Sequence, residues 1–243
     1  MNAIEISGLT KAYNGRTAVD HLNLAIGEGR LFSLLGPNGA GKTTIIRMLC
    51  CLTAPTSGDA LLCGESILKN PAGVRALINV SPQETAVAQK LSVRENLELI
   101  AEIYGMRRRE ARETAEAMMR DFSLADRARE RPAKLSGGLQ RRLSIAMALI
   151  SSPRVLFLDE PTLGLDVRAR KDLWKHVEAL KGKMTIILTT HYLEEAEALS
   201  DRIGILNRGR LSALGTAEEI VKASGRENFE EAFLSLTDEG AEA

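Results

Sequence analysis

The sequence has no net charge, no long apolar run and no cysteine pattern of a metal site. Its 32 basic and 32 acidic residues balance, so the overall charge gives no reason to expect a nucleic-acid partner. No apolar run approaches the ~20 residues that a membrane-spanning helix needs. The opening MNAIEISGLTKAY lacks the basic and apolar regions of a secretory signal. We therefore expect a cytoplasmic protein that reaches a membrane, if at all, through a partner.

The cysteines point to the same compartment. Cys50, Cys51 and Cys63 are odd in number and lack metal-site spacing, which favours small reduced thiols. The 243 residues, 44% of them apolar and 26% charged, suit one large domain or one domain with a subdomain.

The second half of the chain alternates between helix-like and strand-like segments. We expect helices at 139–152, 168–181 and 193–199, and strands at 155–159 and 184–190. This alternation is typical of a parallel α/β core. RLFSLLG (30–36) reads as another buried parallel strand. Runs at 3–9, 19–26 and 59–64 are typical of antiparallel strands, and 204–215 of a closing hairpin that turns at Asn207 to Gly209.

Between about residues 84 and 134 the pattern is helical, with no strand. Ser92 followed by Glu95 predicts a capping box, and 108–122 reads as a second, heavily charged helix. Three arginines at 107–109 suggest a membrane surface, but the acids that follow favour a solvated helical face. Beyond Ala223 we expect a polar tail with one weak helix and a fraying TDEGAEA end.

GPNGAGKTT, between a buried strand and a helix-like segment, fits a phosphate-binding loop. Its glycines let backbone N–H groups converge on phosphate oxygens. Lys42 is expected to reach the β- and γ-phosphates of ATP, and Thr43 to bind Mg²⁺. The predicted ATP-binding residues of this first loop (residues 36–44) are Gly36, Pro37, Asn38, Gly39, Ala40, Gly41, Lys42, Thr43 and Thr44.

Acids end the apolar strand VLFLDE, at the edge where α/β sheets bind ligands. Asp159 is expected to hold Mg²⁺, and Glu160 to orient or deprotonate the attacking water. His191 ends a neighbouring strand, MTIILTTH, so we expect it to contact the γ-phosphate.

A second glycine-containing loop, residues 136–138 of KLSGGLQRR, is either a helix start or a cradle for a phosphate held elsewhere. The chain has one complete ATP loop, so the nucleotide would belong to another copy, with two copies head to tail closing each other's sites. Leu139, which follows, begins a helical stripe with Leu143 and Ala146.

LSGG, together with GPNGAGKTT, LDEPTLGLD and TTH in this order, resembles the ATP-binding cassette domain of transporters. The resemblance covers about residues 3 to 222. It implies an α/β fold, with a P-loop NTPase parallel core, an antiparallel β subdomain and an α-helical insert subdomain. We accordingly expect a cassette domain at 1–223 and a short tail at 224–243.

The resemblance also implies roles that spacing alone does not assign. Tyr13 would stack on adenine, and Gln83 would meet Mg²⁺ and the attacking water and link the site to the helical insert. Across the dimer, the γ-phosphate would be touched by Ser136, Gly137 and Gly138. Asp166 would carry signals between the two sites.

Such domains pair with a polytopic membrane permease, whose short helix enters the cleft beside the helical insert on the inner face of the cell membrane. Cassette proteins with a long coiled coil, zinc-binding cysteine pairs or two cassettes in one chain do not match this sequence. A soluble switch or scaffold ATPase remains the alternative, with a nucleotide kinase a weak third.

LTKAYNGRTAVDHLNLAI, the non-glutamine residue after LSGG and THYLEEAEALSDRI look like the branch that exports drugs, lipids or oligosaccharides, nodulation-factor exporters included. The short tail agrees, because several importer cassettes carry a further C-terminal domain. Other exporters and importers remain alternatives.

Overall fold

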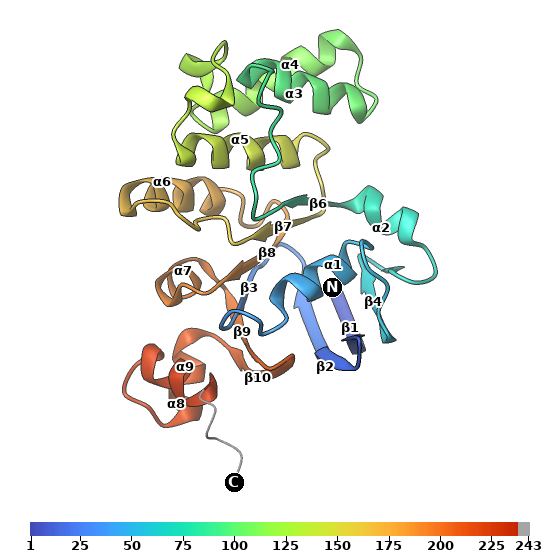
Figure 1. Ribbon diagram of the computed structural model, residues 1–243, viewed down its shortest axis with the longest axis vertical. Helices are drawn as coiled ribbons and strands as arrows, with labels where there is room; N and C mark the ends of the chain where they lie inside the picture. The colour runs from blue at the N-terminus through green and yellow to red at the C-terminus, as the bar shows by residue number, and fades with distance from the viewer. Residues whose placement is uncertain (238–243) are drawn as a thin grey trace.

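The computed structural model describes residues 1–237 and contains two sheets (Figure 1). The first has four strands in the order β2-β1-β4-β5, and the second has six in the order β10-β9-β3-β8-β7-β6. Helices α3, α4 and α5 gather at one end of the molecule, and α8 and α9 lie at the other.

The six-stranded sheet is parallel except at its β9–β10 edge. Every residue is buried in its three central strands, which explains why their sequences are mainly apolar. The parallel strands are β3 (Leu31–Leu35), β6 (Ile78–Ser81), β7 (Val155–Asp159), β8 (Thr185–Thr190) and β9 (Arg202–Asn207). They alternate with α1 (Lys42–Leu49), α2 (Pro71–Leu77), α6 (Val167–Glu178) and α7 (Leu193–Leu199). The predicted parallel core is confirmed.

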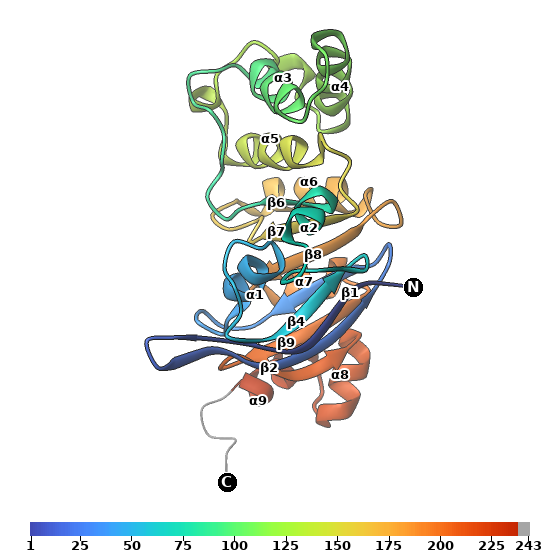
Figure 2. The ribbon, with the colours of Figure 1, turned by 90° about the vertical axis from the view of Figure 1, so that its right-hand side faces the viewer.

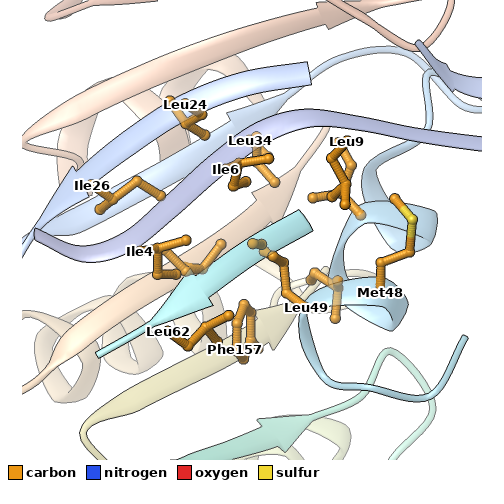
Figure 3. Close-up of a cluster of buried hydrophobic side chains, with 14 of the residues drawn as sticks. Ile4, Ile6, Leu9, Leu24, Ile26, Leu34, Met48, Leu49, Leu62 and Phe157 are labelled. Carbon is orange, nitrogen blue, oxygen red and sulfur yellow. The ribbon is translucent and has the colours of Figure 1, made fainter. Parts of the chain in front are cut away.

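The four-stranded sheet is antiparallel and covers α1. Its strands are β1 (Asn2–Tyr13), β2 (Arg16–Gly27), β4 (Ser57–Leu62) and β5 (Glu65–Ser66). Alternate residues such as Ile4 and Ile6 point inward and pack with Leu62 and Phe157 (Figure 3). The core that joins the two sheets therefore fixes the start of α1, which is where the first loop ends.

The helical insert contains α3 (Val93–Ile103), α4 (Arg108–Asp121) and two 3-10 turns, Ala125–Arg127 and Pro132–Lys134. No strand lies between residues 84 and 134, all of which the structure describes. The capping box of Ser92 and Glu95 is confirmed in both directions. Arg109, 92% exposed, pairs with Glu113 at 2.9 Å, as expected of a solvated face. α5 (Gly137–Leu149) then leads back to the sheet.

The C-terminal part packs more firmly than its composition suggests. After the β9–β10 (Arg210–Gly215) hairpin come α8 (Ala217–Ser224) and α9 (Phe229–Thr237). α9 buries Phe229 and Ala232 in a cluster with Leu35 and Ile203, because its apolar residues recur at helical spacing. The boundary expected at residue 223 falls inside α8, and the division into two regions stays a prediction. Of TDEGAEA, only Thr237 lies within the described residues.

Candidate active site

A cavity of about 310 Å³ lies at the carboxyl edge of the parallel strands. Its walls come from the first loop and from four other segments of the chain. The residues that line it are Ala18, Asn38, Gly39, Ala40, Gly41, Lys42, Thr43, Thr44, Gln83, Glu160, Leu163 and His191. A larger, more apolar cavity of about 580 Å³, between the ends of α4 and α6, contains none of the predicted site residues.

The first loop joins β3 to α1 and leaves the start of that helix open. Gly41 precedes α1 at φ +102°, and no side chain caps the helix. A Cβ on Gly41 would lie 2.5 Å from the carbonyl oxygen of Ala18, so only glycine fits. The uncapped N–H groups at this helix start are suited to binding an anion.

Lys42 lines the cavity and takes part in a buried ion pair. Its Nζ donates to the carbonyl oxygens of Gly36, at 2.6 Å, and Pro37, at 3.2 Å. The same Nζ lies 3.4 Å from Oε1 of Glu160, and the two side chains are 7% and 8% exposed. These contacts hold the Lys42 ammonium group in the wall of the cavity, where a bound phosphate could meet it.

Asp159 accepts hydrogen bonds from the hydroxyl groups of two threonines, one on α1 and one on β8. Thr189 Oγ1 donates to Asp159 Oδ1 at 2.5 Å, and Thr43 Oγ1 donates to the same oxygen at 3.4 Å. A carboxylate and a hydroxyl at this separation are oxygen ligands of the kind that Mg²⁺ prefers. The donor set therefore fits the expected metal.

Glu160 and His191 form the other polar pair of the cavity. His191 Nδ1 and Glu160 Oε2 are 2.7 Å apart, and Glu160 N donates to the carbonyl oxygen of Thr189 at 3.1 Å. Glu160 has φ +48°, a conformation that costs free energy in a residue with a side chain and is concentrated at functional sites. The chain turns sharply here and holds the carboxylate against Lys42 and His191.

The second loop lies outside this cavity. Ser136 and Gly137 are exposed, and Ser136 Oγ caps α5 by accepting from Leu139 N at 3.4 Å. Asp166 caps α6 in the same way, accepting from Ala169 N at 2.8 Å. Leu139 packs against the cluster of the helical insert, as the helical stripe predicts.

Tyr13 ends β1, is 43% exposed and is not among the residues that line the cavity. Lys11 Nζ lies 5.0 Å from the centre of its ring. The structure thus brings together the first loop, Gln83, Glu160 and His191, with Asp159 behind them. It leaves Tyr13 and the residues expected to act across the dimer apart from them.

Three residues of the site were missed by sequence reasoning. Thr189 orients Asp159, Ala18 forms a wall opposite Gly41, and Arg141 donates to backbone carbonyl groups beside the cavity. The sequence does contain a signal for Thr189: it is the second-last residue of the strand β8, and the predicted site residue His191 directly follows that strand. Ala18 and Arg141 act through contacts between distant segments, for which the sequence offers no local pattern.

Comparison with known proteins assigns the family. The model of the ABC transporter family matches residues 19–163. A daunorubicin/doxorubicin resistance ATP-binding protein of Streptomyces peucetius is 45% identical over 225 residues, which are 92% of this chain and 68% of that protein. A daunorubicin resistance ATP-binding protein of Streptomyces coeruleorubidus is 41% identical over 229 residues, 94% of this chain and 72% of the relative.

Solved structures agree. An ATP-binding subunit of an ABC transporter superposes with a TM-score of 0.85 at 30% identity, covering 97% of this chain and 100% of that one. A dimeric ATP-binding cassette in a post-hydrolysis state, bound to ADP and Pi, gives a TM-score of 0.79 at 27% identity, covering 88% and 98%. The expected cassette fold is confirmed.

The chain belongs to the ABC transporter family. It is an ATP-binding and ATP-hydrolysing subunit of a membrane transporter. None of the helices within residues 1–237 has the length and apolarity to cross a membrane.

Proposed function

We propose that two copies of this chain close head to tail around two ATP molecules and thereby drive an exporter. In each site the first loop of one copy cradles the phosphates, and the second loop of the other copy completes the site. Closure is a population shift, driven by contacts that ATP makes only in the closed state.

The observation that carries the proposal is the position of the second loop. It presents exposed Ser136 and Gly137 at the start of α5, yet it does not line the cavity that the first loop forms. A helix start binds anions through its free N–H groups. In a single chain, therefore, the start of α5 is not in position to contact the phosphates bound by the first loop. A second copy supplies one.

Within a closed site the residues have distinct proposed roles. Glu160 orients or deprotonates the attacking water, His191 contacts the γ-phosphate while holding Glu160, and Gln83 reports the nucleotide to the helical insert. Mg²⁺, held by Thr43, Asp159 and Gln83, would neutralise charge that develops on the phosphates. Tyr13 would stack on adenine at the open rim, and Asp166 would lie at the contact between the two copies.

The direction of transport rests on the relatives. Those named above are described as drug-resistance ATP-binding proteins, which supports export of drug-like molecules. The expected partner is a polytopic permease that holds the chain on the inner face of the cell membrane, and no nucleic-acid partner is proposed. Co-purification of a polytopic subunit from native membranes would favour this over a soluble switch ATPase.

The decisive test of dimer closure is Glu160→Gln. The amide keeps the shape of the side chain but cannot act as a base, so ATP should bind without being cleaved. We expect hydrolysis to fall at least about 10²-fold and the variant to accumulate as a dimer with ATP, measured by light scattering coupled to gel filtration. The same variant with ADP is the control. A variant that stayed monomeric at saturating ATP would contradict the proposal.

A further inference from the structure

Arg141 ties three distant segments of the chain together beside the cavity. It belongs to α5, one turn beyond the second loop, and is 5% exposed. Its Nη1 donates to the carbonyl oxygen of Pro82 at 2.5 Å, and its Nη2 donates to that of Gln83 at 2.5 Å. Nη2 also lies 3.5 Å from the carbonyl oxygen of Glu160.

A buried guanidinium is costly unless its donors are satisfied. Burial lowers the pKa of Arg141, while the charges of Asp159 and Glu195 act in the opposite direction. Neutral carbonyl groups accept its hydrogen bonds, so the planar fork of arginine, with donors aimed at several acceptors, is what the position requires. A lysine would keep the charge but could not reproduce the fork.

A second contact fixes the same face of α5. Ser144 Oγ and Ser81 Oγ are 3.0 Å apart and buried, and Ser144 lies three residues beyond Arg141, where side chains share a helix face. Figure 2 shows α5 between the helical insert and the edge strand β6. The helix is therefore held to the segment that leads to Gln83 at two successive points.

We propose that Arg141 is a positioning residue that couples the two half-sites carried by one chain. The second loop of a chain serves the nucleotide of its partner, whereas Gln83 and Glu160 serve the nucleotide of that chain. Arg141 lies about 4.5 Å along the helix axis from Gly138, and its fork contacts the backbone of both Gln83 and Glu160. A shift of α5 when the second loop meets a phosphate thus moves the catalytic carboxylate and glutamine of the other site.

This inference rests on the proposed head-to-tail dimer, and a complementation experiment separates the two. Lys42→Ala removes the first loop's lysine, and Gly137→Asp blocks the second loop. A mixed dimer of these two variants retains one intact site, made from the first loop of the Gly137→Asp chain and the second loop of the Lys42→Ala chain. Arg141→Lys is then added to one chain or to the other.

If Arg141 couples both half-sites, the added substitution should lower kcat of the complemented dimer about tenfold in either arrangement. The ATP dissociation constant of each chain should stay within roughly threefold. Arg120→Lys, on the exposed side of α4, is the matched control and should change neither value. Loss of activity in only one arrangement, or in neither, would overturn the coupling role.

Failure of the unmodified mixture to regain activity would instead refute the head-to-tail dimer, and the inference with it. A second measurement needs no change at Arg141. In the Glu160→Gln chain, hydrogen exchange of the peptides 78–88 and 136–144 should become protected at the same ATP concentration. Separate midpoints would show that the two segments respond independently, which contradicts the proposal even if Arg141→Lys does not fold.

Discussion

The two glycine-containing loops use the same chemistry in opposite surroundings. Each places a helix start where a phosphate can approach. The first is surrounded by its own chain. Its Lys42 donates a hydrogen bond to a carbonyl oxygen of the loop and forms an ion pair with Glu160. The second has an exposed serine and glycine and does not line the cavity of the first. One site is thus nearly complete in a single chain, whereas in the proposed dimer the other loop is half of a site.

The glycines of the two loops differ in what surrounds them. At Gly41 a side chain is excluded by the chain itself, since a Cβ would meet the carbonyl oxygen of Ala18 at 2.5 Å. At Gly137 a Cβ would meet nothing closer than Leu165 Cδ2, at 3.6 Å. An aspartate therefore fits at 137 in the isolated chain, and any functional damage must come from what approaches from outside.

The largest effect is expected for Gly137→Asp. The carboxylate would face the γ-phosphate of the partner's nucleotide, and repulsion should lower hydrolysis by at least about 10²-fold. Binding of ATP to the first loop should remain, because that loop lies elsewhere. Equilibrium binding of a fluorescent ATP analogue, together with phosphate release, measures the two properties separately.

A mixture of two inactive variants serves as the control for Gly137→Asp. Gly137→Asp and Lys42→Ala chains, each inactive alone, should together regain up to about a quarter of wild-type activity, because half of randomly formed dimers are mixed and each has one intact site. A mixture as inactive as its components would show that the second loop does not act on a neighbouring chain.

His191→Ala alters the cavity that the first loop forms. Its Nδ1 lies 2.7 Å from Glu160 Oε2, so its loss frees the carboxylate to move toward Lys42. We expect kcat to fall about 10²-fold with little change in the ATP dissociation constant. His21→Ala, at an exposed histidine of β2, is the matched control. A proportional loss of ATP binding would indicate a role in holding the nucleotide instead.

Local chemistry made the first loop, the strand end with Asp159 and Glu160, and His191 predictable, since each is a short motif after a buried strand. The elements that escaped prediction lack such signals. α2 has seven residues and buries only Val74, so it is too short for a helical period to stand out in the sequence. Arg141 is an ordinary arginine in the sequence, and its three carbonyl partners lie far along the chain.

The tail illustrates the opposite error. Its composition is polar, yet Phe229 and Ala232 are spaced to share one helix face and are buried there. Average polarity hid a periodic apolar pattern, which is the stronger signal for a packed helix.

Leu139→Gln should have a much smaller effect than Gly137→Asp, two residues away. Leu139 packs with the helical insert and makes no contact with the cavity, so its replacement costs apolar contact without adding charge near phosphate. We expect ATPase activity within a few-fold of wild type and a slightly lower melting temperature, measured by phosphate release and calorimetry. Equal damage from both substitutions would mean that residue 139 touches the partner's nucleotide.

The smallest effect is a change in thermal stability, expected on replacing a buried acid that is influenced by the charge of Glu160. Glu195, on α7, is fully buried and accepts from Trp174 Nε1 at 3.0 Å. Burial raises the pKa of Glu195 above its usual value of 4.5, and the charge of Glu160 acts in the same direction. The nearby Thr190 and Thr162 hydroxyl groups and the hydrogen bond from Trp174 oppose the rise.

Because the folded chain holds the proton more tightly than the unfolded chain, this group favours the fold most below about pH 4.5. Its contribution is lost as the pH rises through the raised pKa. Glu195→Gln removes the titration and keeps an oxygen for Trp174. The substitution should therefore raise Tm at pH 8 by roughly 2–4 °C relative to wild type, and the gain should shrink toward pH 5. Calorimetry across this range measures it, and a gain independent of pH would show that the ionised carboxylate costs the fold nothing.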